Sequence, residues 1–374
     1  MKIVAIGKYF PPFFGGVELM TELSARALSI SHDVTVICHS NDSAGSKEEL
    51  DGYKLVRCAT QLTLYKQPVS LDMGREIQKA RPDLIHFHAP NFWGAAMISL
   101  YAPKTPIIVT HHADVEGRPV IRTMLMPLYR RIVERAATII VASRKTALMS
   151  PDLLGKFHNL SEIPLGVDER KFGIASSEIA SIRASKHDRF GTDVLYGFVG
   201  RLVWYKGLPV LLEAFSHVRG ARLVIVGDGP MKAKLVRLAQ SLGIGDRVTF
   251  VGKVSESEKK RMMHEMDVLV LPSTHKTEAF GLVQVEAQLC GKPVITTDLP
   301  TGVSDVTVDG VTGRIVKAGD CISLASAMQQ LADDEALREQ FGAAGKRRAL
   351  GLYTERHYMD RLRAEVETVL AGAR

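Results

Sequence analysis

The chain has 374 residues, 46% of them apolar, which suits about two domains that each bury a core of their own. Its excess of 7 positive charges is modest, and four cysteines without C-x-x-C or metal-ligand spacing argue against zinc and for a reducing compartment. The N-terminal apolar run is too short for a signal peptide, and no run approaches the roughly 18 apolar residues of a spanning helix, so we expect a cytoplasmic protein.

Short apolar runs alternate with helical patterns in the first part of the chain. The runs, read as strands, are Lys2–Ile6, Val34–Cys38, Leu84–Phe87, Ile107–Thr110 and Ile139–Ala142. The helical patterns between them are Val17–Ser29, Leu71–Ala80 and Met124–Ala137. This alternation predicts a doubly wound parallel sheet in a first domain, residues 1–168.

The alternation stops at a polar stretch with neither period, so we place a linker at 169–189. A second domain, 190–353, then repeats the architecture with strands Val194–Val199, Arg222–Val226, Val248–Val251, Val268–Leu271 and Pro293–Thr296. A last helical stretch, 354–374, has no strand after it and is long enough to cross back over the first domain.

The first strand leads into a glycine-containing loop that ends at Gly15-Gly16 before a helix, an arrangement that faces phosphate groups. Thr110-His111-His112-Ala113-Asp114 ends another strand at the same edge. Adjacent strand residues point to opposite faces, so one histidine at most reaches a ligand. His86 and His88 share a face, but no third metal ligand is near them in sequence.

Glu278 and Glu286 lie eight positions apart around Phe280-Gly281, directly after the strand Val268–Leu271. A strand, a small-residue loop and a helix direct free N–H groups and the positive end of the helix dipole outward. The two acids would then accept hydrogen bonds from hydroxyls of a sugar and a ribose, and the alternative is a solvated helix face.

Arg201 and Lys206 lie on the loop after Val194–Val199, at the carboxyl edge of the predicted sheet. A guanidinium and an ammonium group five positions apart suit a diphosphate. Val226-Gly227-Asp228-Gly229-Pro230 is only a weak dinucleotide signal, because the third glycine is missing.

Residues 117–145 carry seven cations against one acid, Glu134, interleaved with apolar residues. The pattern is a basic amphipathic helix. It either packs on the sheet with a solvated basic rim or docks on an anionic bilayer, and nucleic acid is a weaker third choice because no aromatic-rich motif accompanies the charge.

With these segments in place, the chain resembles the retaining nucleotide-sugar glycosyltransferases that share the GT-B fold and an E-x7-E motif (group 1 glycosyltransferases). The segments that carry the resemblance are Pro11-Pro12, Gly15–Glu18, His112–Asp114, Pro164–Asp168, Gly200–Gly207, Val226–Pro230, Glu278–Glu286 and Gly291–Val294. The resemblance implies two Rossmann-like domains facing across a cleft, with the acceptor mainly on the first and the donor on the second. It also implies transfer with retention of configuration and without a metal or other cofactor.

Carried over by position, the resemblance assigns Arg201 and Lys206 to the donor diphosphate, Glu286 to the ribose and Glu278 to the sugar. His112 fits the family's sugar-contacting histidine better than His111, although Ala113 stands where the family more often has glycine. The implied donor-binding set is Gly15, Gly16, Arg201, Lys206, Lys253, Val254, Glu278, Ala279, Phe280, Gly281, Leu282 and Glu286. The implied catalytic set is His112, Arg201, Lys206 and Glu278.

Thr277–Ala287 and Leu299–Val303 are similar to segments of bacterial enzymes that build O-antigen and exopolysaccharide, several of which use GDP-mannose or GDP-rhamnose. We therefore expect transfer of mannose or rhamnose to a saccharide acceptor linked to a polyprenyl diphosphate, at the inner face of the cytoplasmic membrane. Two alternatives stay open: transfer from a UDP-sugar to a soluble or lipid acceptor, and a module that binds a nucleotide sugar without turnover.

Overall fold

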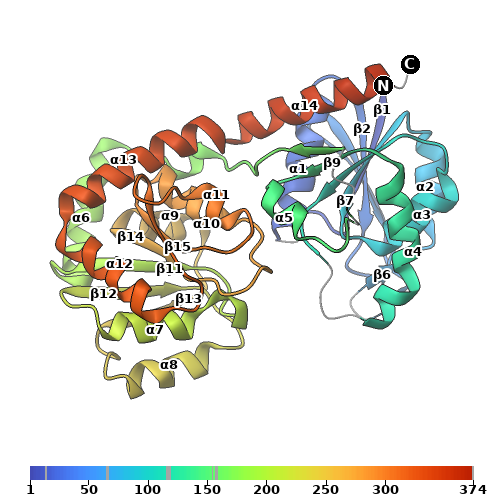
Figure 1. The fold of residues 1–374 in the computed structure, drawn as a ribbon. Coiled ribbons are helices and arrows are strands. Elements are labelled where there is room, and N and C mark those ends of the chain that lie inside the picture. Colours follow the sequence, from blue (N-terminus) through green and yellow to red (C-terminus); the bar gives the residue numbers. More distant parts are fainter. Residues whose placement is uncertain (13–14, 65–66, 115–118, 154, 156–158, 373–374) are drawn as a thin grey trace. The chain divides into compact units, whose positions relative to one another are not determined.

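The computed structural model describes residues 1–12, 15–64, 67–114, 119–153, 155 and 159–372, with side chains in these ranges except at 119–125 and 176. The chain forms two compact units, Met1–Leu165 with Glu355–Arg374, and Gly166–Thr354. Each unit has a largely parallel sheet with helices on both faces (Figure 1). The predicted fold class, two doubly wound α/β domains, is confirmed.

Unit 1 is built around one large sheet. Its strands are β1 (Lys2–Ile6), β2 (Asp33–His39), β3 (Ser46–Leu50), β4 (Tyr53–Cys58), β7 (Leu84–Ala89), β8 (Ile107–His111), β9 (Ala136–Val141) and β10 (Leu160–Glu162). Its helices are α1 (Gly16–Ser29), α2 (Asp72–Ala80), α3 (Phe92–Tyr101), α4 (Pro119–Arg135), α5 (Arg144–Leu148) and α14 (Glu355–Gly372). The strand order is β10-β9-β8-β7-β1-β2-β4-β3, with β3 antiparallel at one edge, and β5 (Leu62–Leu64) and β6 (Gln67–Val69) form a separate hairpin.

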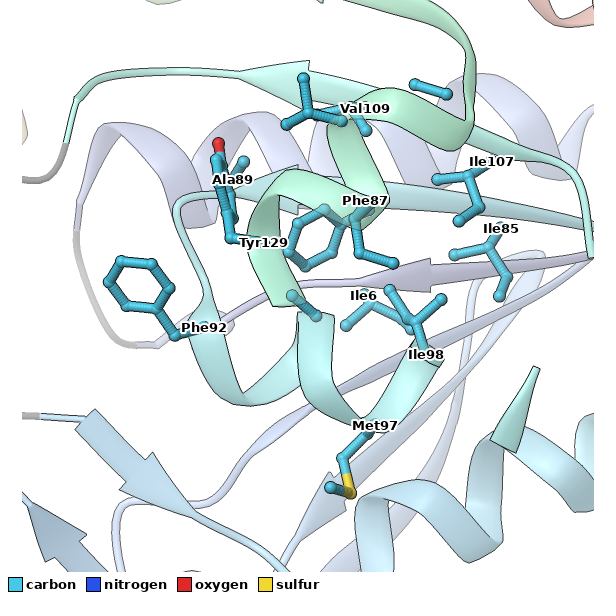
Figure 2. Packing of buried hydrophobic residues seen from close by; sticks show 14 of the residues in the cluster. Ile6, Ile85, Phe87, Ala89, Phe92, Met97, Ile98, Ile107, Val109 and Tyr129 are labelled. Atoms are coloured by element: carbon cyan, nitrogen blue, oxygen red, sulfur yellow. The ribbon is translucent and has the colours of Figure 1, made fainter. Parts of the chain in front are cut away.

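The central strands of unit 1 are buried along their whole length. Every residue of β7 and of β8 is buried, as a parallel sheet covered on both faces requires. On one face, Phe87 and Val109 point toward α3 and α4, where Phe92 and Tyr129 pack edge to face with ring centroids 5.7 Å apart (Figure 2). Burial of each such side chain contributes about 1.5–3 kcal/mol.

Helix α14, the last element of the chain, belongs to unit 1. Its buried residues recur every fourth position: Tyr358, Leu362, Val366 and Leu370. They pack with α1, and the hydroxyl groups of Tyr358 and Ser24 are hydrogen-bonded at 2.8 Å. Among the described helices, none is long and apolar enough to cross a membrane.

Unit 2 has a six-stranded sheet in the order β13-β12-β11-β14-β15-β16, with every pairing of the sheet parallel. The strands are β11 (Val194–Val199), β12 (Ala221–Val226), β13 (Val248–Gly252), β14 (Val268–Leu271), β15 (Val294–Thr297) and β16 (Gly313–Val316). The helices are η1 (Glu169–Phe172), α6 (Ser176–Phe190), η2 (Trp204–Lys206), α7 (Leu208–Ser216), α8 (Lys232–Ser241), α9 (Glu256–Glu265), α10 (Leu282–Leu289), α11 (Val303–Val306), α12 (Cys321–Asp333) and α13 (Glu335–Leu352).

The stretch expected to be a linker, residues 169–189, contains η1 and nearly all of α6. The absence of an apolar period in this stretch has a physical reason, because α6 is attached to α9 through polar contacts. Ser185 Oγ donates to Glu265 Oε1 at 2.7 Å, and Arg189 pairs with Glu265 Oε2 at 2.9 Å. A helix attached through hydrogen bonds and an ion pair to the buried Glu265 does not need the apolar face by which a helix is predicted from sequence.

Candidate active site

The predicted donor loops start at the centre of the unit 2 sheet. Strands β11 and β14 are parallel neighbours, with Tyr196 opposite Val268. β12 and β13 lie beyond β11 on one side of this pair, and β15 and β16 lie beyond β14 on the other. In open α/β sheets, ligands bind at such a switch point, beyond the carboxyl ends of the strands. The loops 200–207 and 272–281 both begin there.

Glu278 is buried on the second loop and is held by three neighbours. Its Oε2 lies 2.5 Å from Lys206 Nζ of the first loop and accepts a hydrogen bond from Ser273 Oγ at 3.0 Å. Its backbone carbonyl accepts from Thr301 Oγ1 at 2.8 Å. The fold therefore joins two residues that are 72 positions apart in sequence, Lys206 and Glu278, in one ion pair.

Gly281 lies between the second loop and α10. Its φ of +73° is in the left-handed region, and a Cβ there would lie 2.6 Å from Leu271 Cδ2, so the position requires glycine on both counts. The first N–H groups of α10, at Leu282 and Val283, are at the positive end of the helix dipole and have no i−4 carbonyl within the helix. This terminus can hold negative charge.

Glu286, in the second turn of α10, pairs with Lys259 of α9 at 3.2 Å, and Lys259 also pairs with the exposed Glu256 at 3.0 Å. Burial raises the pKa of Glu286 despite the nearby ammonium group of Lys259. Burial also lowers the pKa of Lys259, but the two carboxylates outweigh this effect and leave that pKa raised. Lys259 therefore stays charged at neutral pH and orients Glu286.

Lys259 was not among the predicted site residues. A lysine in the first turn of a helix belongs to none of the motifs that the sequence displays, and it lies 27 positions from Glu286. The only sequence signal is its position, shortly after Lys253-Val254. Its contact with Glu286 depends on how α9 and α10 pack beside each other.

These groups surround one cavity of about 350 Å³. Its lining residues are Val199, Gly200, Lys206, Lys259, Glu278, Gly281, Leu282, Val283 and Glu286. The two predicted carboxylates thus face a single cavity, each with a lysine beside it. Such a cavity offers acceptors for hydroxyl groups and cationic donors for phosphate oxygens.

The remaining predicted donor residues of unit 2 lie outside the cavity lining: Arg201, Lys253, Val254, Ala279 and Phe280. Arg201 and Lys253 are exposed at the same edge of the sheet, after β11 and β13. The Phe280 ring is buried and packs edge to face on Tyr353, with ring centroids 5.9 Å apart, so the ring is not available to a ligand.

The Gly227-Asp228-Gly229 segment supports the first loop. Gly200 N donates to Val226 O at 3.0 Å, and Leu202 N donates to Asp228 O at 3.0 Å. A Cβ on Gly227 would lie 1.9 Å from Gly200 O, so the two loops approach too closely for any side chain there. These glycines have a packing role, which explains why they follow the dinucleotide pattern only in part.

Gly207, at the end of the loop 200–207, packs against the loop 272–281, and its replacement by alanine is expected to lower the free energy of unfolding by about 3 kcal/mol. Its φ is +69°, and a Cβ would lie 1.8 Å from the carbonyl oxygen of Pro272. Gly220→Ala is the matched control, because Gly220 has a φ of +63° and open space around the position. We expect about 1 kcal/mol for the control in urea unfolding followed by circular dichroism. Equal losses would show that the approach to Pro272 is unimportant.

In unit 1, the structure separates the two candidate histidines. The ring of His111 is buried, with Nδ1 3.2 Å from Tyr129 Oη and Nε2 3.3 Å from both Ser150 Oγ and Asp114 Oδ1. Both of its nitrogens are thus engaged within the unit. His112 is partly exposed and contacts His88 instead, with His112 Nε2 3.0 Å from His88 Nδ1. Of the two, only His112 has a ring nitrogen, Nδ1, without a hydrogen-bond partner among the described residues, and this nitrogen could contact a ligand.

Gly15 and Gly16 mark the start of α1. Gly15 is extended, and a Cβ on it would meet the flexible side chain of Glu18. A Cβ on Gly16 would meet nothing within 4 Å. The packing of unit 1 therefore does not require glycine at position 16.

The basic stretch 117–145 contributes an apolar face to the core of unit 1. Its described residues Met126, Tyr129, Ile132 and Val133 are buried, whereas Arg130 and Arg131 are exposed. Arg118 and the side chain of Arg122 lie outside the described residues. The described part of this segment is thus a helix that packs on the sheet and has a solvated basic rim, as the first interpretation of the sequence predicted.

Within the described ranges, no group of three or more His, Cys, Asp or Glu side chains has the arrangement of a metal site. The buried pair His86 and His88 has its rings 4.3 Å apart, and His86 Nε2 is bonded to Thr110 Oγ1 at 2.7 Å. The metal alternative for these histidines therefore has no third ligand among the described residues.

Comparison with known proteins identifies the class to which this fold and cavity belong. Residues 14–171 match the model for Glycosyltransferase Family 4, and residues 182–348 match the model for Glycosyl transferases group 1. The O-antigen chain mannosyltransferase C of Escherichia coli is 28% identical over 96% of both chains. A phosphatidyl-myo-inositol mannosyltransferase of Mycobacterium leprae is 32% identical over 70% of this chain and 67% of its own.

Among solved structures, the sucrose-phosphate synthase of Thermosynechococcus elongatus superposes with a TM-score of 0.80 over 99% of both chains, at 21% identity. This likeness shows a shared GT-B fold. The chain therefore belongs to the group 1 glycosyltransferases, and the family predicted from its motifs is confirmed.

Proposed function

We propose that this glycosyltransferase moves mannose from GDP-mannose to a hydroxyl group of a lipid-linked saccharide, with retention of configuration and without a metal ion. The observation that carries the proposal is the cavity at the β11–β14 switch point, with its Lys206–Glu278 and Lys259–Glu286 pairs. The two relatives named above support mannose as the sugar. The same names, an O-antigen chain and a phosphatidylinositol, support a cell-surface glycan or glycolipid as the acceptor.

Each part of the donor has a matching group in unit 2. Glu286, oriented by Lys259, accepts hydrogen bonds from the ribose hydroxyls. Lys206 and the N-terminus of α10 bind the diphosphate. Glu278 binds hydroxyls of the sugar, and Lys206 can keep its contact with Glu278 because an ammonium group has three donors. Arg201 reaches the diphosphate from the solvent side of the same loop.

Departure of GDP leaves an oxocarbenium-like sugar and adds one negative charge to the diphosphate, which was already anionic. Fixed positive groups near the leaving diphosphate lower the activation barrier of this step most. In unit 2 these groups are the ammonium group of Lys206 and the first N–H groups of α10. This charge takes the place of a metal ion in the proposal. The acceptor hydroxyl attacks from the same face and gives its proton to a departing phosphate oxygen.

We propose that the protein reaches its lipid-linked acceptor as a peripheral protein at the inner membrane face. The apolar residues of α4 from Met126 onward are packed in the core, so this part of the helix does not insert in a bilayer. The exposed Arg130 and Arg131 offer electrostatic attraction to anionic lipid, at about 1 kcal/mol for each cation.

The test is nucleotide release from GDP-, UDP- and ADP-sugars, with and without a bacterial membrane extract as acceptor and with and without EDTA. Release from GDP-mannose, raised by the extract and unchanged by EDTA, is expected. NMR of the product should show the anomeric configuration of the donor. Release from a UDP-sugar alone would replace the proposed donor, and binding without release under any condition would favour the non-catalytic alternative.

Glu286→Gln is expected to weaken donor binding by about 10- to 100-fold, because it removes a charged hydrogen-bond acceptor. Glu256→Gln is the matched control, since Glu256 pairs with the same Lys259 but is exposed and lies outside the cavity lining. The affinity of Glu256→Gln for GDP, measured by calorimetry, should stay within about 2-fold of wild type. Similar losses in both variants would contradict the assignment of Glu286 to the ribose.

A further inference from the structure

The fully buried side chain of His88 contacts His112, whose other ring nitrogen has no hydrogen-bond partner among the described residues. His88 is the last but one residue of strand β7 and has 0% exposure, and the backbone N–H of His112 donates to the carbonyl of Ala89, the last residue of that strand. The two rings lie nearly parallel, 10° apart, and His88 Nδ1 is 3.0 Å from His112 Nε2. The contacts between the end of β7 and the residue after β8 therefore hold the rings of His88 and His112 against each other.

Both rings are neutral around pH 7. Burial and the neighbouring histidines His111 and His86 lower the pKa of His112 to about 3, and burial lowers the pKa of His88 well below its usual value. The nearest acid in sequence, Asp114, contacts His111 and Ser150. Two neutral imidazoles joined by one N···N hydrogen bond share a single proton between those two nitrogens.

The other nitrogen of His88 decides where that proton lies. His88 Nε2 is buried and has no hydrogen-bond partner among the described residues. A buried N–H without an acceptor is rarer in proteins than a buried acceptor without a donor. The tautomer of His88 in which Nε2 is unprotonated is therefore favoured. The proton of His88 is then on Nδ1 and is donated to His112 Nε2, which leaves the proton of His112 on Nδ1.

We propose that His88 is a positioning residue that fixes His112 with its proton on Nδ1, so that His112 offers the bound sugar a hydrogen-bond donor and not a base. The role at the sugar depends on the proposed function, whereas the position of the proton does not. Nδ1 is the ring nitrogen of His112 that is not bonded to His88. With a proton on it, that nitrogen can donate to a sugar hydroxyl oxygen but has no lone pair to accept the acceptor's proton.

This assignment narrows the chemistry of the proposed transfer. If His112 cannot accept a proton, the acceptor hydroxyl must lose its proton to another group. In the scheme above, that group is an oxygen of the departing diphosphate. His112 instead holds the sugar in place for the attack from the same face.

The direct test is ¹⁵N NMR of the protein labelled with ¹⁵N-histidine, in which protonated and bare ring nitrogens have distinct shifts. The His88 and His112 signals are assigned from His88→Asn and His112→Asn, and no donor or acceptor is needed. We expect both rings to carry the proton on Nδ1. A proton on His112 Nε2 in the wild type would overturn the proposal whatever the enzyme's substrate is.

The kinetic test compares two replacements of His88. Asn places an amide N–H₂ where Nδ1 was and should keep kcat within about 3-fold, whereas Leu removes the donor and should lower kcat by about 10- to 100-fold with little change in KM for the donor. Thr110→Val is the control for packing, because it removes the partner of the neighbouring buried His86. Equal loss of kcat in Thr110→Val and His88→Leu, or in the Asn and Leu variants, would overturn the positioning role.

Discussion

Replacement of Lys206 by alanine is expected to lower turnover by about 100-fold or more, the usual effect of losing one preorganised charge donor to a leaving group. Lys206 is the cation that the cavity places closest to Glu278, at 2.5 Å, and it lies on the loop beside the N-terminus of α10. The measurement is the initial rate of GDP release under saturating donor. A rate near wild type would contradict the assignment of Lys206 to the diphosphate.

Two further variants separate charge from packing. Lys206→Met keeps most of the stem of the side chain and should lose as much turnover as the alanine variant, because the loss comes from the ammonium group. Lys234→Ala removes an exposed lysine of α8 that lies outside the cavity lining and should leave turnover unchanged. Since Lys206→Ala also leaves the buried Glu278 without its ion pair, thermal unfolding of each variant should accompany the rates.

Acidification from pH 7 to pH 5 is expected to destabilise unit 1, and two buried histidines, His39 and His86, should account for about 4 kcal/mol of the loss. This loss is in addition to the contribution of His88 and His112. Burial lowers the pKa of His39 to about 3 and that of His86 to about 4. In the unfolded chain both titrate near about 6.5, so between these values the unfolded state binds more protons. The stability is complete above about pH 6.5 and is lost as the pH falls toward the folded pKa values, at about 2 kcal/mol for each histidine by pH 5.

Urea unfolding at the two pH values measures this loss, and tryptophan fluorescence can follow unit 1 alone. Trp93 lies in unit 1, and the other tryptophan, Trp204, is exposed and can be replaced by phenylalanine. In that background, His39→Phe should remove about 2 kcal/mol of the acid effect. Stability at pH 7 should change little, because neither ring nitrogen of His39 has a partner among the described residues. An unchanged pH dependence would show that His39 is not the group that titrates.

The strands of both sheet centres could be predicted because burial on two faces demands continuous apolar runs. The predicted runs Lys2–Ile6, Val194–Val199 and Val268–Leu271 agree with β1, β11 and β14 residue by residue. The strand β3 was not predicted, because it lies at a sheet edge with three of its five residues exposed. Such an edge strand has hardly any periodic signal, since its pairing with β4 comes from backbone hydrogen bonds.

Part of the candidate cavity in unit 2 was predictable for a related reason. Parallel strands end at one edge of a sheet, so loops that follow neighbouring strands meet there whatever their spacing in sequence. That rule, with the motif, places Glu278, Gly281 and Glu286 near Lys206, and the structure gathers all four around one cavity. The same rule places Arg201 at the edge but does not set the direction of its side chain, and the structure leaves it exposed outside the lining.

The sequence by itself determined the family, the two α/β domains and the loops that line the candidate site, because these follow from local apolar periods and from motifs whose glycines and charges are adjacent in the chain. The tertiary structure decided the contacts between distant segments. It paired Lys259 with Glu286, bonded both nitrogens of His111 inside unit 1 and placed His112 against His88. Such contacts depend on how helices and strands pack side by side, and a period or a motif along one segment does not encode that packing.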